Sequence, residues 1–173
     1  MSQTGHAGGA VFDQVLDLPL HPLIVHAAVF LIPLAGLLGV LFVIPKTRAW
    51  ARLPMLIVAL AGAAVAHVSR ESGQALLVAI SATASPEEMA AAVAHEEHGD
   101  RLFYYSLAYA VVAVLAYLLS IPGRSVFRGI LAIVVSVVLV AGAGALMWQT
   151  VIAGHSGAVA VWNPDGSIDY SRP

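Results

Sequence analysis

The chain has 173 residues, of which 60% are hydrophobic and 10% are charged, and its formal net charge is −2. A soluble domain carries roughly 25% charged residues, so the composition excludes an ordinary soluble protein and predicts an integral membrane protein. The absence of cysteine excludes disulfides, thiolate metal sites, iron–sulfur clusters and covalent attachment of c-type haem. The few basic residues form no extended surface, so nucleic-acid binding is not expected.

Four apolar stretches reach the roughly 20 residues that a helix needs to cross a hydrocarbon core about 30 Å thick. They cover about residues 22–44, 54–72, 102–121 and 127–152. The sequence therefore predicts an all-α fold, a four-helix bundle in the membrane that forms a single domain over residues 1–173. The capping box "SPEE" predicts an additional amphipathic outer helix over about 86–98. Whether this helix is continuous with the third span is left open by the sequence.

Two short connections between the spans are basic and contain no acid: "IPKTRAWARLP" after the first span and "IPGRSVFRG" after the third. By the positive-inside rule these turns face the cytoplasm. Both termini and all ten acidic residues are then expected on the extracytoplasmic side. The expected location is a bacterial inner or plasma membrane, with the lipid bilayer as the first partner.

Six histidines lie at the expected outer ends of the spans, and at least one belongs to each span. Pro22 is expected at the first helical position, which would make His21 the N-cap of the first helix. The six, in chain order, are His21, His26, His67, His95, His98 and His155. Titratable rings are costly next to hydrocarbon, so their gathering at one membrane end predicts a functional site.

Spacing ranks these candidates. His67, Glu71 and Gln74 follow one another at i, i+4 and i+7 and share one helical stripe, and His95 and His98 stand at i, i+3. We rank His26, His67 and His98 as the first ligands. The further candidates are His21, His95, Glu71 and His155.

Two kinds of site fit these residues. In the first, two imidazoles from facing helices are the axial ligands of haem b, which requires no local motif. In the second, three or four histidine and glutamate side chains hold zinc, iron, copper or manganese, since imidazole and carboxylate without thiolate suit those ions. No catalytic residues are identified, so we expect a binding or electron-transfer protein rather than an enzyme.

Other classes of function remain open. The small residues of Ala61–Ala64 and Ala141–Ala145 favour close helix packing, which suits a cofactor-free scaffold, an accessory subunit of a membrane complex or a homo-oligomer. These segments also belong to a faint internal repeat, in which "AGAAVAH" resembles "AGAGALM". A proton-coupled transporter using the stripe of His67, Glu71 and Gln74 is a third alternative, although no span carries a charge near its middle.

Four segments, "HPLIVHAAVFLIPLA", "ESGQAL", "HEEHGDRL" and "GHSGAVAVW", occur in this order across all four spans. Together they resemble the bacterial membrane family known as domain of unknown function 2231, over about Leu20 to Trp162. The resemblance implies a four-helix membrane protein. Some members of that family are fused to Rieske iron–sulfur domains, which implies a link to membrane electron transfer and favours haem. Any Rieske or respiratory partner of this chain is expected to be a separate polypeptide.

Overall fold

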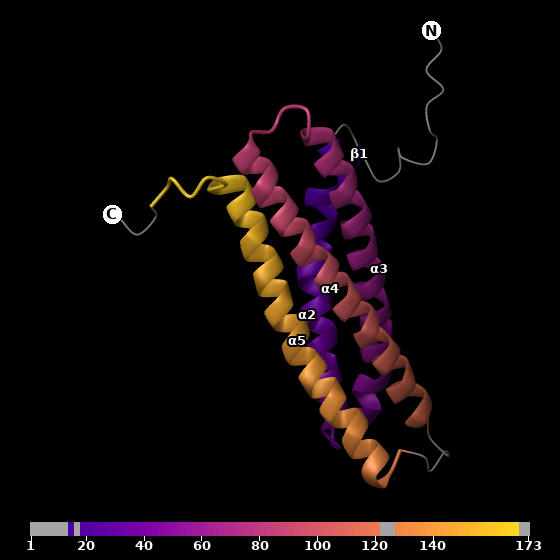
Figure 1. Ribbon diagram of the computed structural model, residues 1–173. Helices are drawn as coiled ribbons and strands as arrows, with labels where there is room; N and C mark the ends of the chain where they lie inside the picture. The colour runs from indigo at the N-terminus through magenta and orange to yellow at the C-terminus, as the bar shows by residue number, and fades with distance from the viewer. Residues whose placement is uncertain (1–13, 16–17, 122–126, 170–173) are drawn as a thin grey trace.

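The computed structural model describes residues 14–15, 18–121 and 127–169. A short antiparallel pair of strands, β1 (Gln14–Val15) and β2 (Leu18–Pro19), precedes the helices. Four long helices follow and lie side by side as a bundle (Figure 1): α2 (Leu20–Val43), α3 (Arg48–Ile80), α4 (Pro86–Leu119) and α5 (Gly129–Trp162). Each is long and apolar enough to cross a membrane. The predicted all-α four-helix bundle is confirmed.

The helices run alternately up and down, and each has two principal neighbours. Both α2 and α4 pack against α3 and α5. The start of α2, the α3–α4 connection and the end of α5 lie at the same end of the bundle (Figure 1). We call this the histidine end, because the six candidate histidines belong to it. The opposite end, which carries Arg48 and Arg52, is the arginine end.

The start of α2 differs from the sequence prediction. The helix begins at Leu20 with Pro19 as its N-cap, so His21 lies in the first turn rather than at the N-cap. Pro22 is accommodated because the first N–H groups of a helix have no intrahelical partner. His21 therefore projects from a regular helix.

The question left open for the third span is also answered. The capping box is confirmed, with Ser85 N–H donating to Glu88 Oε2 at 2.8 Å and Glu88 N–H donating to Ser85 Oγ at 3.2 Å. From this cap α4 runs without interruption to Leu119. The outer helix and the third span are one element, and α5 likewise continues to Trp162, past the predicted end of the span.

At the arginine end, two side chains satisfy carbonyl groups where helices stop. Arg48 Nε donates to Phe42 O at 3.1 Å and its Nη2 to Val43 O at 2.9 Å. Arg52 Nη1 donates across the bundle to Ser120 O at 3.0 Å. The last carbonyls of a helix have no intrahelical donor, so these arginines cap α2 and α4. Arg124, in the second basic turn, lies outside the described residues.

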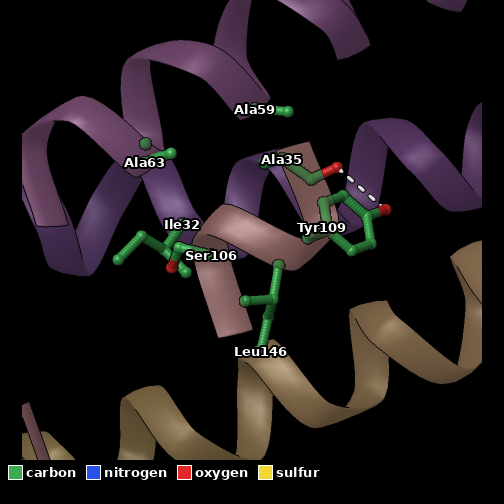
Figure 2. A pocket seen from close by; sticks show the side chains of 8 residues that line it. Ile32, Ala35, Ala59, Ala63, Ser106, Tyr109 and Leu146 are labelled. Atoms are coloured by element: carbon green, nitrogen blue, oxygen red, sulfur yellow. Dashed lines mark hydrogen bonds between the residues drawn. The ribbon is translucent and has the colours of Figure 1, made fainter. Parts of the chain in front are cut away.

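The centre of the bundle is packed from small residues around one large aromatic side chain. Tyr109 of α4 lies where all four helices meet, and its hydroxyl donates to Ala35 O at 3.4 Å (Figure 2). Its ring and hydroxyl occupy the space left by Gly39 of α2 and Gly142 of α5. Small residues allow such close approach where lipid provides no hydrophobic drive for association.

The outward faces of the helices carry large apolar side chains. Phe30 is 66% exposed and Ile133 is 63% exposed. Exposed apolar surface on this scale would be unfavourable in water, where it marks an interaction site. The exterior of the bundle is therefore the surface of a multi-pass membrane protein in contact with lipid.

The contact of Tyr109 with two glycines gives a test of the packing. A Cβ at Gly39 would overlap the Tyr109 hydroxyl, whereas a Cβ at Gly142 would lie 2.8 Å from ring carbon Cδ2. Overpacking costs about 1–3 kcal/mol, so Gly39→Ala and Gly142→Ala should each lower the unfolding temperature in detergent. Adding Tyr109→Phe should relieve Gly39→Ala in part, because it removes the hydroxyl but leaves ring carbon Cζ 3.1 Å from the added Cβ, and it should not relieve Gly142→Ala.

Gly144→Ala is the matched control, since no side chain and no other helix lies within 4 Å of a Cβ at that position of α5. Its unfolding temperature should not fall below that of the parent protein, because alanine has the higher helix propensity. Rescue of both clashing variants by Tyr109→Phe would contradict the described position of the ring.

Candidate functional site

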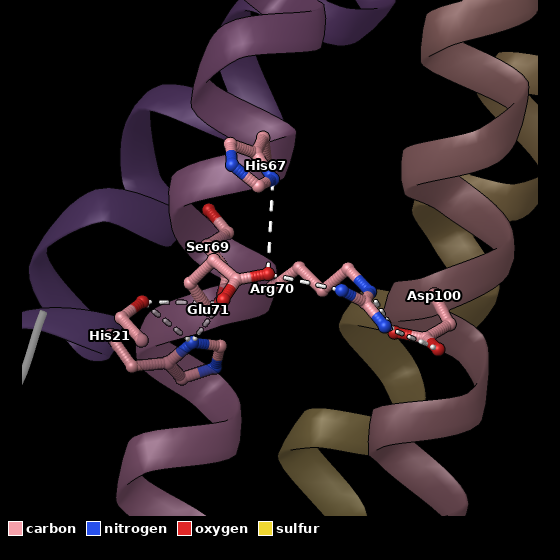
Figure 3. Close-up of polar contacts among 7 residues, drawn as sticks. His21, His67, Ser69, Arg70, Glu71 and Asp100 are labelled. Atoms are coloured by element: carbon pink, nitrogen blue, oxygen red, sulfur yellow. Dashed lines mark hydrogen bonds and ion pairs between the residues drawn. The ribbon is translucent and has the colours of Figure 1, made fainter. Parts of the chain in front are cut away.

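His21 connects the first turn of α2 to α3. Its Nδ1 lies 2.9 Å from the main-chain oxygen of Ser69 (Figure 3). The hydroxyl of Ser72 is 3.5 Å from the same nitrogen and donates to the Ser69 carbonyl at 3.1 Å. A carbonyl oxygen can only accept a hydrogen bond, so Nδ1 of His21 carries the proton. In the neutral ring the free lone pair is then on Nε2.

His95 makes the corresponding connection between α4 and α5. Its Nδ1 lies 3.1 Å from Ser156 Oγ, and that hydroxyl donates to Ala153 O at 3.0 Å. Since the single hydroxyl proton is used toward Ala153, the Ser156 oxygen must accept from the ring. His95 therefore also carries its proton on Nδ1 and has Nε2 free.

The two rings meet at the histidine end of the bundle. The ring centroids of His21 and His95 are 5.9 Å apart and the ring planes are inclined by 72°. Both residues are partly buried. One ring comes from α2 and the other from α4, and they are anchored on α3 and α5, so all four helices contribute to the pair.

The other candidate histidines are placed differently. His26 is exposed, with Nδ1 2.7 Å from Pro22 O of its own helix, and His155 is exposed. The side chain of His67 is 54% exposed and lies 3.9 Å from Glu71 and beside the ring of Phe103. Two of the three ligands ranked first by the sequence, His26 and His67, are thus on the surface.

His98 lies one helical turn further along α4 than His95. It is partly buried, and its Nδ1 is buried without a hydrogen-bond partner in the described part of the chain. The main-chain oxygen of His98 accepts a hydrogen bond from Gln149 Nε2 of α5 at 3.0 Å. His98 therefore lies near His95, without being anchored through Nδ1 as His21 and His95 are.

The residues that hold the rings were missed by the sequence reasoning. Ser69, Ser72 and Ser156 act through hydroxyl or main-chain oxygens, which no ligand motif singles out. A signal was nevertheless present, because the dipeptide Ser-Gly occurs near the outer end of both the second and the fourth spans.

An ion-pair network lies near His21 and joins α3 to α4 (Figure 3). Arg70 Nε is 2.8 Å from Asp100 Oδ1, and its Nη1 is 3.0 Å from Glu71 Oε1. The predicted stripe of His67 and Glu71 is thus tied to Arg70 rather than directed toward His21. These charges are about a quarter to a third exposed, as expected for groups near a membrane interface.

The residues described by the structure contain no group of three or more histidine, aspartate or glutamate side chains arranged to hold a metal ion. An ion bound only by protein usually needs three or four such ligands. The arrangement that is present is a pair of imidazoles with two free Nε2 atoms.

A sequence model of the family described as "Predicted membrane protein (DUF2231)" matches residues 17–167. The chain belongs to this family. The DUF2231 match covers all four helices of the bundle and both rings of the pair, and it confirms the resemblance noted in the sequence. No curated protein and no solved structure gives a significant match.

The Arg70–Asp100 pair gives a second test. Asp100→Asn removes the carboxylate that faces Arg70 across α3 and α4, and we expect a loss of about 1–2 kcal/mol in unfolding free energy, between the values for exposed and buried pairs. Unfolding in detergent measures the loss. Glu97→Gln is the control, because the Arg101–Glu97 pair has side chains 57% and 65% exposed and should contribute below about 0.5 kcal/mol. Equal losses in both variants would refute this assignment.

Proposed function

We propose that this DUF2231 protein binds haem b through His21 and His95 and serves as an electron-transfer component of the membrane. The observation that carries the proposal is the ring pair itself. Two imidazoles from different helices have ring centroids 5.9 Å apart, and each is hydrogen-bonded at Nδ1, which leaves the lone pair of the neutral ring on Nε2.

The number of donors favours haem over a bare ion. Haem iron receives four nitrogens from the porphyrin and needs only two axial ligands from the protein. Zinc, copper, manganese or non-haem iron would need a third or fourth side chain, and the described residues form no such group. The donor set therefore fits haem b best, with His21 and His95 as its ligands.

The anchoring of the rings supports the same conclusion. A metal-ligating histidine almost always donates its second ring N–H to a carbonyl or carboxylate, which fixes the ring and raises its basicity. His21 donates to the Ser69 carbonyl, and His95 reaches the Ala153 carbonyl through the Ser156 hydroxyl. His21 and His95 would therefore hold the haem iron through their Nε2 atoms, because Nδ1 of each ring is already hydrogen-bonded.

Bound haem b would supply one-electron transfer. The chain itself would hold the two axial nitrogens, fix their orientation through α3 and α5, and limit access of water through the apolar faces of the helices. The basic turns predict that the site faces the extracytoplasmic side. A separate membrane redox protein of the Rieske or respiratory type would exchange electrons with it, in keeping with the Rieske fusions known in the family.

The proposal predicts the spectrum of the purified protein. After expression with an adequate haem supply, the parent protein should show a Soret band and the sharp reduced α-band of a low-spin, bis-imidazole haem. His21→Ala and His95→Ala should each abolish the low-spin spectrum, because each removes one axial ligand. Absorption and electron paramagnetic resonance spectra measure this.

His26→Ala and His155→Ala are the matched controls, since both histidines are exposed. They should leave the spectrum unchanged. A protein that remains colourless and gains no low-spin spectrum with added haemin would reject the proposal. If such a protein still assembled normally into a larger membrane complex, the scaffold function would be favoured instead.

A further inference from the structure

The two halves of the bundle repeat the same arrangement of buried residues. The sequence separation between His21 and His95 also relates other residues of α2 and α4. At this separation, each of the six buried residues of α4 has a buried counterpart in α2. Examples are the pairs Ile32 and Ser106, Gly39 and Ala113, and Phe42 and Ala116. The hairpin of α2 and α3 and the hairpin of α4 and α5 are therefore structural counterparts.

The second helix of each hairpin shows the same correspondence. The spacing between Ser72 and Ser156 also relates three pairs of buried residues, Met55 and Leu139, Gly62 and Leu146, and Ala66 and Thr150. This separation between counterpart residues differs by one helical turn from the separation between the similar segments "AGAAVAH" and "AGAGALM". A shift of one turn keeps each residue on nearly the same face, which explains why the repeat is faint in the sequence.

Each hairpin forms one socket for an imidazole. In the first, His21 lies against Ser72 and Gly73, and in the second, His95 lies against Ser156 and Gly157. The serine hydroxyl in both sockets donates to the carbonyl of the residue three positions earlier. The same dipeptide therefore contacts both rings, although the closest acceptor is the Ser69 carbonyl for His21 and the Ser156 hydroxyl for His95.

The glycine of each socket faces the ring directly. A Cβ at Gly73 would lie 3.1 Å from Cε1 and from Nδ1 of His21. A Cβ at Gly157 would lie 2.9 Å from Cε1 and 3.3 Å from Nδ1 and Nε2 of His95. A side chain at either position would make the ring shift by a few tenths of an ångström, so glycine lets each imidazole approach the helix closely.

We propose that Ser72–Gly73 and Ser156–Gly157 are paired positioning residues, which present two equivalent imidazoles to one ligand bound between the hairpins. This inference rests on the proposed function for the identity of the ligand. Because both sockets are built from the same Ser-Gly dipeptide against an imidazole, the ligand should offer two equivalent coordination faces, which is the property of a planar iron porphyrin. A ligand with two different ends would not require matching sockets.

The sockets can be tested in the absence of any ligand. In detergent-solubilised protein labelled with 15N-histidine, His21 and His95 should both show the spectrum of a neutral ring protonated at Nδ1. Gly157→Ala should shift the His95 signals and Gly73→Ala those of His21. Gly154→Ala and Gly99→Ala are the controls, because no atom lies within 4 Å of a Cβ at either position.

Milder variants serve if the alanine substitutions at the socket glycines prevent folding. Ser156→Ala removes the group that accepts from His95, whereas Ser72→Ala leaves the Ser69 carbonyl in place for His21. Loss of a group that orients a metal ligand typically lowers affinity about 10–100-fold. We therefore expect a loss of haem affinity in that range for Ser156→Ala and a smaller loss for Ser72→Ala.

The outcomes separate this inference from the proposed function. Two Nδ1-protonated rings that respond selectively to their own glycines, in a protein that never binds haem, would reject haem binding and retain the sockets. Opposite tautomers in the two rings, or equal responses to Gly154→Ala and Gly157→Ala, would overturn the sockets even if haem is bound.

Discussion

Close approach of helix backbones is the constraint on which the rest of this structure depends. In lipid, apolar side chains gain little by turning inward, so helices associate through van der Waals contact and hydrogen bonds at small residues. The buried positions of the bundle are accordingly rich in alanine and glycine, and Tyr109 fills the space that they leave. Glycine has the same effect at the histidine end, where Gly73 and Gly157 make room for imidazole rings as Gly39 and Gly142 do for the Tyr109 ring. Small residues therefore determine both the packing of the helices and the positions of the two histidine rings.

The sequence predicted the bundle because its signals are local. The lengths of the apolar stretches identified four membrane helices, and the capping box located the start of α4 at Ser85. The continuity of α4 through Gly99 was not predictable, since a glycine in a helix costs only about 1 kcal/mol and surrounding contacts readily compensate. The arginines of the first turn illustrate another limit, because Arg48 and Arg52 also cap helix ends. The position of these arginines is therefore explained by helix capping as well as by the positive-inside rule, which predicted the orientation.

The sequence predicted that histidines form the candidate site, but it did not predict which histidines pair. The gathering of histidines at one end followed from their positions along the spans, whereas the pairing of His21 with His95 depends on the rotation of each helix about its axis. That rotation is decided by distant contacts, such as the fit of Tyr109 against Gly39 and Gly142. The sequence analysis placed His21 at the N-cap of a helix beginning at Pro22, whereas α2 begins at Leu20 and the His21 ring contacts Ser69 of α3.

The lengths of the uncharged stretches, rather than of the whole helices, determine how the protein sits in the bilayer. Helix α2 has 24 residues and spans about 36 Å, while the other three, with 33 or 34 residues, span about 50 Å. The longer helices exceed a hydrocarbon thickness of about 30 Å, but charged residues limit their apolar parts. In α3 the uncharged stretch runs from Leu53 to Ser69, and in α4 it runs from Leu102 to Leu119. Charges are costly in hydrocarbon, so these limits fix the vertical position of the molecule together with the ends of α2. Since His21 lies in the first turn of α2 and His95 lies just before Asp100 in α4, they also set the immersion depth of the ring pair.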